Sequence, residues 1–149
     1  MQGIRWVQMS DDERTEFLGR GGTGVISFAE GVDTAPFTVP VSYGYDTESG
    51  WFYFRLSFQP DSTKEDVVDR PVSFVTHRRT DDGWRSVVAT GALEDVSEDD
   101  HASTAVQGLW AVEIPEVDIF ERPRDDVEFR EFRLDPDSLS GRKEVQTEG

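Results

Sequence analysis

Alternating apolar and polar residues mark most of this chain as β-strand. From Phe37 to Tyr45, aromatic and aliphatic side chains occupy every second position, which is the period of a strand with one buried face. Short runs rich in branched and aromatic residues, bounded by turn residues, predict five more strands, over 23–29, 51–57, 71–79, 84–96 and 127–134. The sequence Thr80-Asp81-Asp82-Gly83 predicts a tight turn between two of them.

Helical patterns are short and lie between the strands. Ser10 followed by Glu13 has the spacing of a capping box and predicts a helix that ends at the glycines 19–22. Phe17 and Leu18 would face inward from it. Two further helices are predicted, over 60–70 and 97–109.

Five or six short strands with two or three small helices predict a mainly β fold. Strands and helices do not alternate regularly, which favours an antiparallel barrel over a parallel sheet. The 149 residues are enough for one hydrophobic core, so we expect a single domain over 1–149. After about residue 136 the sequence is polar and predicts a loose C-terminal tail.

Net charge narrows the choice of partners and surroundings. The chain has 31 Asp and Glu against 15 Lys and Arg, a formal net charge of −16, so nucleic acid and anionic membranes are unsuitable partners. Ten Phe and four Trp supply the apolar surface that acidic disordered chains lack. Dense carboxylates on a folded domain are typical of a halophilic cytoplasm, where a Debye length of about 3 Å in molar salt screens their repulsion.

Several site types are excluded by composition. The chain has no Cys, which rules out disulfides, thiolate catalysis and cysteine-bound zinc. His77 and His101 are not spaced as metal ligands, so no metal site is expected. No run of about 20 apolar residues is present, and the N-terminus lacks the apolar stretch of a secretory signal, so we expect a cytoplasmic protein.

The glycine-rich segment Gly19–Gly24 satisfies G-x-G-x-x-G, the pattern of dinucleotide-binding proteins. That pattern requires a strand before the glycines and a helix after them. Here the predicted helix precedes and the predicted strand follows. Termination of the helix and a turn therefore explain the glycines.

Pro40 lies inside the best-patterned strand. Proline cannot donate a backbone hydrogen bond, so this strand lies at an edge, carries a bulge or faces a ligand at this point.

Cations and hydroxyls follow on the next two elements. Arg55 and Ser57 end the return strand, and Ser62-Thr63-Lys64 opens the predicted helix 60–70. A helix N-terminus with hydroxyls and a cation favours phosphate binding. The alternative is an ordinary surface lysine that pairs with a neighbouring carboxylate.

These segments resemble the pyridoxamine 5'-phosphate oxidase-like family of FMN-binding split barrels, in its branch related to nitroimidazole-resistance proteins. The likeness is carried by 24–28, by Val39-Pro40-Val41-Ser42-Tyr43, by the aromatic strand 51–55 with the turn 62–64, and by 84–87. The resemblance implies an antiparallel, Greek-key split β-barrel. It also implies a homodimer with FMN at the subunit interface and a small-molecule substrate.

The resemblance further implies which residues hold the flavin. Cations and hydroxyls would bind the phosphate and the ribityl chain, and strand backbone would contact the ring edge. The implied residues are Val39, Pro40, Val41, Arg55, Leu56, Ser57, Ser62, Thr63, Lys64, Arg85, Ser86 and Val87. Trp110 or Phe120 of the partner subunit would cover the ring, or else pack in the core or the dimer interface. No catalytic residue is assigned.

Departures from the oxidase pattern bear on the activity. Thr38 and Tyr43 lie near the places where the oxidase has an arginine and a lysine, and Thr63 replaces an arginine before the phosphate lysine. The C-terminal Arg-Leu-x-Pro is echoed at 133–136, without a nearby upstream Arg-x-His pair. Pyridoxamine phosphate oxidation itself is therefore not expected.

Three readings of the function follow from the resemblance. The first is an FMN-dependent oxidoreductase that transfers two electrons to or from a small organic substrate. The second is a flavin-binding protein without turnover, such as a carrier, sensor or electron-transfer partner. The third keeps the barrel with a deazaflavin; haem fits less well, since only His, Tyr or Met could serve as its axial ligand.

Overall fold

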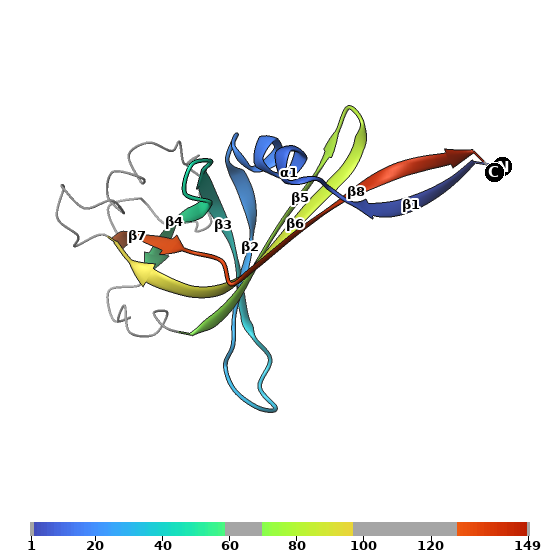
Figure 1. The fold of residues 1–149 in the computed structure, drawn as a ribbon. Helices are drawn as coiled ribbons and strands as arrows, with labels where there is room; N and C mark the ends of the chain where they lie inside the picture. Colours follow the sequence, from blue (N-terminus) through green and yellow to red (C-terminus); the bar gives the residue numbers. More distant parts are fainter. Residues whose placement is uncertain (1, 59–69, 97–127, 149) are drawn as a thin grey trace.

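A computed structural model describes residues 2–58, 70–96 and 128–148, with side chains over 3–56, 70–96 and 131–146 (Figure 1). Within these ranges the chain forms eight strands and one helix. They are β1 (Gln2–Gln8), α1 (Asp11–Leu18), β2 (Gly22–Phe28), β3 (Phe37–Asp46), β4 (Trp51–Phe58), β5 (Pro71–Thr80), β6 (Gly83–Asp95), β7 (Glu128–Leu134) and β8 (Ser138–Glu148). The mainly β fold and the six predicted strands are confirmed, with ends that differ by a residue or so.

Six antiparallel strands close into a barrel. They follow the order β5–β2–β3–β4–β7, and β6 completes the ring by pairing with both β5 and β7. Along one edge β6 pairs first with β8, through 85–90, and then with β7, through 93–95. The barrel is therefore split where β6 passes from one partner strand to the other, which confirms the predicted split-barrel class.

Aromatic side chains fill the barrel interior. Tyr43, Phe52, Phe54, Phe74 and Phe132 are fully buried, and each lies at an inward position of its strand. The ring centroids of Tyr43 and Phe74 are 5.2 Å apart, and those of Phe54 and Phe74 are 4.9 Å apart, both edge to face. Such a barrel is packed solid, so a ligand of flavin size has to bind on its outside.

Helix α1 begins with the predicted capping box. The Ser10 hydroxyl accepts a hydrogen bond from the Glu13 backbone N–H at 3.2 Å, and the Glu13 carboxylate accepts one from the Ser10 N–H at 3.1 Å. Phe17 and Leu18 are buried as expected. The other two predicted helices lie, apart from Arg70, outside the described residues.

The two chain ends differ from the prediction. No strand was predicted over 2–8, and the loose tail predicted after about residue 136 is wrong, because β8 occupies that segment. β1 and β8 pair in register from Gln2 with Glu148 to Gln8 with Arg142, and the ribbon they form extends away from the barrel (Figure 1). Pairing with β6 and β1 makes a strand of a polar sequence whose own pattern does not predict one.

Among the residues described, the single helix α1 has eight residues and is too short and too polar to cross a bilayer.

Candidate functional site

The N-terminal half of β3, residues 37–41, is an open edge of the barrel. β3 pairs with β2 from Phe37 to Tyr43, but with β4 only from Ser42 to Asp46. Residues 37–41 therefore have a strand on one side, and no strand of the described ranges pairs with their other side. Pro40 predicted an edge strand, a bulge or a ligand-facing position, and in the structure it lies on an edge. The backbone of Val39, Pro40 and Val41 is available there to a ligand.

The middle of the barrel surface beside this edge carries no charged residue. We define the outer face as the outward positions within 23–27 of β2, 38–42 of β3, 73–77 of β5 and 86–90 of β6, which the strand register brings together; Arg79 of β5, paired with Trp84, lies just beyond its end. These are Thr23, Val25, Ser27, Thr38, Pro40, Ser42, Ser73, Val75, His77, Ser86, Val88 and Thr90. In a chain in which 31% of the residues are charged, an uncharged patch of this extent is distinctive.

Two rows of the outer face differ in chemistry. One row is apolar, formed by Pro40, Val25, Val75 and Val88 on neighbouring strands, and Val25 and Val88 remain 41% and 38% exposed. Exposed valines on a face without charges favour contact with another surface.

The next row consists of hydroxyls. The register aligns Thr38, Ser27, Ser73 and Thr90, and the hydroxyls of Ser27 and Thr38 are 2.8 Å apart. A hollow of about 420 Å³ lies at this end of the face, lined in part by Ser27, Ser73 and Thr90. The prediction from sequence missed this row. Its signal was present, because the outward positions of these strands carry Ser and Thr where an acidic surface would carry Asp and Glu.

Arg55 lies where the pairing of β3 with β4 ends. It is directly opposite Ser42, the last β3 residue paired with β4 before the open edge. Its Nε donates to the Glu131 carboxylate at 3.3 Å, and its side chain is 36% exposed. Glu131 therefore orients the guanidinium group, and the two Nη groups keep donors for a further acceptor.

The structure brings some predicted site residues to the open edge and leaves others elsewhere. Val41 and Leu56 point into the core, so only their backbone can contact a ligand; Val39 packs against the same core. Ser57 lies in β4, with its side chain outside the described residues, as are Ser62, Thr63, Lys64, Trp110 and Phe120.

The three predicted residues of β6 are not at the open edge. Ser86 lies on the outer face but three strands from the open edge of β3, roughly 14 Å along the sheet at about 4.8 Å per strand. Val87 is fully buried. Arg85 points to the opposite side, into a pocket beneath α1, so it does not join Arg55 in one phosphate site.

Two buried tyrosines near the site remain neutral phenols. Burial raises the pKa of Tyr43, inside the barrel, and of Tyr53, on the outward side of β4. The Tyr53 hydroxyl has no hydrogen-bond partner among the described residues, whereas the Tyr43 hydroxyl lies near Thr76 and Arg78, whose influence on its pKa opposes that of burial. Both can donate a proton in a hydrogen bond, but neither is a base at neutral pH.

A six-stranded barrel split along β6, with a ligand-accessible edge on β3, defines the chain as a split-barrel protein. The FAD binding protein of Mycobacterium smegmatis has this fold, with a TM-score of 0.65, 15% identity and coverage of 95% of this chain and 99% of that one. An FAD-binding protein of Mesorhizobium loti has a TM-score of 0.63 and 22% identity, with coverage of 96% of this chain and 99% of that one. A candidate 5-nitroimidazole antibiotic resistance protein of Bacteroides thetaiotaomicron has a TM-score of 0.63 and 14% identity, with coverage of 99% of this chain and 93% of that one.

The sequence itself settles the family. The sequence pattern of the family described as pyridoxamine 5'-phosphate oxidase matches residues 10–143, most of the chain. The chain therefore belongs to the pyridoxamine 5'-phosphate oxidase family, as the resemblance predicted. No curated protein sequence matches it.

Proposed function

We propose that this protein is an FMN-binding oxidoreductase that acts as a homodimer and transfers two electrons to or from a small organic substrate. The flavin would lie between the two subunits, against the open edge of β3. The observation that carries the proposal is the uncharged outer face beside that edge.

Charge favours a second copy of the chain on the outer face. Two copies that each carry a formal charge of −16 repel one another, and the repulsion is least where neither presents a carboxylate. The cores of protein interfaces are likewise depleted of charged residues. The small side chains of the face also allow two sheets to approach to about 10 Å, the usual spacing of packed sheets. A symmetric, face-to-face dimer follows.

The open edge supplies the groups that a flavin needs. Backbone N–H and C=O groups of residues 39–41 would contact the ring edge, and Arg55, oriented by Glu131, would donate to the phosphate. Ser62, Thr63 and Lys64 would complete the phosphate site, and Ser57 would bind the ribityl chain. FMN would supply the redox chemistry once bound, while the protein positions it and shields one side.

The identity of the flavin has one competing candidate. Two proteins of the same fold are described as binding FAD, so FAD is tested beside FMN. A flavin-binding protein without turnover, and the same barrel with a deazaflavin, remain the alternatives for the activity. Pyridoxamine phosphate oxidation is not proposed.

The first experiment is a spectrum and a titration. The protein is purified in molar KCl, its visible absorption is recorded, and FMN, FAD and a deazaflavin are each titrated by quenching of their fluorescence. Tight binding of FMN supports the proposal. Reduction of the bound FMN by a donor, followed by reoxidation by a small organic acceptor over many cycles, separates an enzyme from a carrier. No binding of any flavin would contradict the proposal.

The interface is tested by placing a charge on it. Val88→Glu puts a carboxylate on the apolar row of the outer face. It should convert the dimer to a monomer, measured by light scattering, and lower the affinity for FMN, measured by titration. Val32→Glu makes the same change at a loop position that is 90% exposed, and it is the matched control. A Val88→Glu protein that remains dimeric would place the interface elsewhere.

A further inference from the structure

Three cations lie side by side on the face of the sheet opposite the outer face. The register pairs Arg78 of β5 with Arg85 of β6, and Arg85 with Lys143 of β8. Directly paired residues of antiparallel strands share one face, with Cβ atoms about 4.5–5.5 Å apart, and like charges in such pairs are destabilising. In a chain with twice as many acidic as basic residues, this row requires a reason.

Among the described residues, one of the three cations has an acidic partner within ion-pair distance. The Lys143 ammonium contacts the Glu13 carboxylate at 2.6 Å, and this bond, with the Ser10 N–H, lowers the pKa of Glu13 to about 2. The other ion pairs among described side chains involve neither Arg78 nor Arg85.

Neutral groups hold the two arginines in place. Arg78 donates to the Phe17 carbonyl oxygen at 2.9 Å and lies 4.1 Å from the centroid of the Phe17 ring. Arg85 donates through one Nη to the carbonyl oxygens of Trp84, at 3.1 Å, and Glu144, at 3.5 Å. Carbonyl groups fix both guanidinium groups but do not neutralise them.

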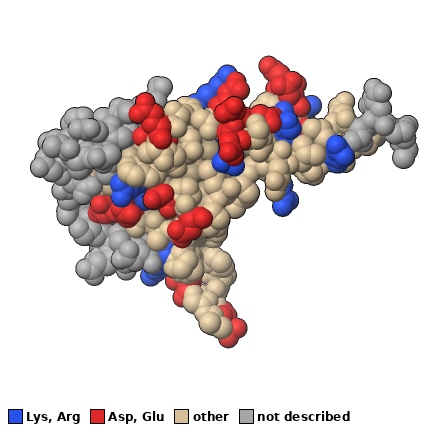
Figure 2. All heavy atoms as spheres, in the orientation of Figure 1, with Lys and Arg blue, Asp and Glu red and all other residues tan. Residues whose placement is uncertain are grey.

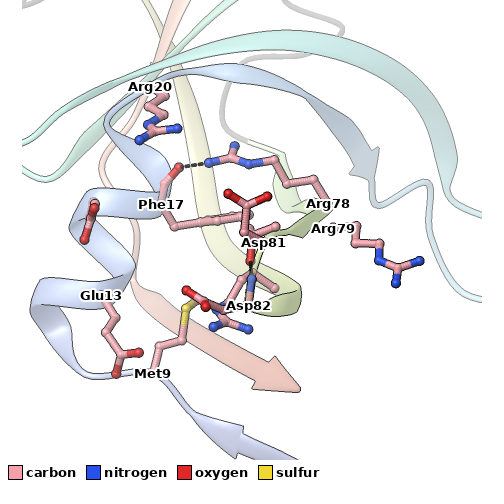
Figure 3. Close-up of a pocket in the computed structure, with 11 residues that line it drawn as sticks. Met9, Glu13, Phe17, Arg20, Arg78, Arg79, Asp81 and Asp82 are labelled. Carbon is pink, nitrogen blue, oxygen red and sulfur yellow. Dashed lines mark hydrogen bonds between the residues drawn. The ribbon is translucent and has the colours of Figure 1, made fainter. Parts of the chain in front are cut away.

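Both arginines line a pocket of about 430 Å³ between α1 and the β5–β6 hairpin. Figure 3 shows the guanidinium groups of Arg20 and Arg78 on either side of the Phe17 carbonyl, whereas Arg79 points away. Four carboxylates also line the pocket: Asp81 and Asp82 of the hairpin turn, and Glu13 and Glu16 of α1. Glu13 pairs with Lys143, and no salt bridge among the described residues joins any of the four to Arg78 or Arg85.

We propose that this pocket binds an oxyanion of the phosphate class, with Arg78 and Arg85 as its main ligands and Arg20 as a third. Guanidinium groups match the oxygens of a phosphate in pairs of hydrogen bonds. A bound oxyanion relieves the repulsion between the two paired arginines. The volume lies in the range of small-molecule pockets, about 300–1,000 Å³, so the phosphate group is either free or carried by a small molecule.

This site is separate from the proposed flavin site. Arg85 and Arg78 lie beneath α1, and the open edge of β3 and the outer face lie on the other side of the sheet. The oxyanion site therefore stands whether or not the chain binds FMN.

The test is calorimetric titration with inorganic phosphate, pyrophosphate and ribose 5-phosphate at constant ionic strength, both without flavin and with FMN added. We expect one saturable site per chain that added FMN does not block. Arg85→Gln should weaken binding at least about tenfold, as loss of a charge-assisted hydrogen bond does. Arg70→Gln, which removes the same charge from an arginine paired with Glu30, is the matched control.

The outcomes separate the two sites and the two ligand sources. Phosphate binding that survives Arg55→Gln but is lost in Arg85→Gln supports the proposal. Phosphate binding that is lost in Arg55→Gln but survives Arg85→Gln assigns the ion to the flavin site and overturns the proposal. Tighter binding of ribose 5-phosphate than of inorganic phosphate indicates a carried phosphate group, and equal affinities indicate the free ion. If Arg85→Gln fails to fold, Arg20→Gln, at an exposed turn position, replaces it.

The main rival is neutralisation by the hairpin's own carboxylates. If Asp81 and Asp82 act as counter-ions of the arginines, phosphate will bind only after both are changed to Asn. Binding confined to that double variant, or no saturable binding at all, would overturn the proposal.

Discussion

Gly24 of β2 lies where a side chain would clash with β5. A Cβ placed there would lie 2.5 Å from the Val75 carbonyl oxygen and 2.6 Å from the Phe74 ring. Both neighbours are fixed, one by the strand and the other by the packed core, so neither can move aside cheaply. The glycine is therefore required by space and not by its backbone angles.

Gly24→Ala should accordingly destabilise the fold. We expect a loss of about 1–3 kcal/mol in the free energy of unfolding, the usual cost of overpacking, measured by urea denaturation in high salt. Val25→Ala, at the next position but with a side chain 41% exposed on the outer face, should cost less. Equal losses for the two variants would contradict the close contact.

Glu13 should make stability depend on pH in a defined window. Its pKa is lowered from 4.5 to about 2 by Lys143 and Ser10, so the folded state binds its proton less readily than the unfolded state. The stabilisation is complete above 4.5 and is lost as the pH falls towards 2. The difference in urea midpoint between wild type and Glu13→Gln should shrink over this window. A difference that is constant with pH would contradict the role of this carboxylate.

Arg55 and Lys64 give the residue-level test of the flavin site. Arg55→Gln should raise the dissociation constant of FMN at least about tenfold, because a charge-assisted hydrogen bond to phosphate is lost. Lys64→Glu should abolish FMN binding while the fold is kept. Arg70→Gln is the control of matched charge. Unchanged affinity in Lys64→Glu would remove that lysine from the site.

At the scale of elements, sequence pattern predicts strands well where one face is buried. Along β3, the apolar residues Val39, Val41, Tyr43 and Tyr45 occupy every second position because this side of the strand packs on the aromatic core, so the pattern reflects the burial. The sequence of β8 has no such alternation. Its serines and charged residues form a strand only because β6 and β1 pair with it. The sequence could not predict that, since the cause is elsewhere in the chain.

The same limit applies to the candidate site. Pro40 predicted an irregular place in β3, and the structure has an open edge there. The assignment of Arg85 to the same site rested on the resemblance of residues 84–87 to a flavin-contacting strand of the family. It could not anticipate that Arg85 faces α1, because one position of shift along a strand reverses the side that a residue occupies.

The β1–β8 ribbon should be the least protected sheet of the molecule. Beyond Lys143 it has no third strand among the described residues, and Ile4 and Trp6 are 65% and 51% exposed. Two-stranded ribbons are marginally stable alone. The amide hydrogens of the β1–β8 ribbon should therefore exchange with deuterium much faster than those of β5 and β6. Hydrogen-exchange mass spectrometry measures this difference. Equal protection would indicate that another surface covers the ribbon.

At the scale of the whole molecule, charge is the dominant feature. On the face shown in Figure 2, the acidic residues of the described ranges form separate clusters, several beside Lys or Arg, with uncharged surface between them. The formal charge of −16 disfavours the compact state when salt is low, because the repulsion between carboxylates is then unscreened. This arrangement is the physical basis for the proposed adaptation to high salt.

We therefore expect the thermal unfolding midpoint to rise as KCl increases from dilute buffer to molar concentration. Sucrose at matched viscosity is the control, since it stabilises without screening charge. Equal midpoints in low and high KCl would contradict adaptation to high salt.

The pairing of β1 with β8 has a consequence for synthesis in the cell. β1 leaves the ribosome before all the barrel strands, and its partner strand β8 follows only after them. At about 5–20 residues per second, roughly ten seconds pass before that partner emerges. During this time Ile4 and Trp6 belong to a strand with a free edge on a nascent chain. Among the described elements, β1 therefore waits longest for its partner strand and depends most on protection by chaperones until β8 has emerged.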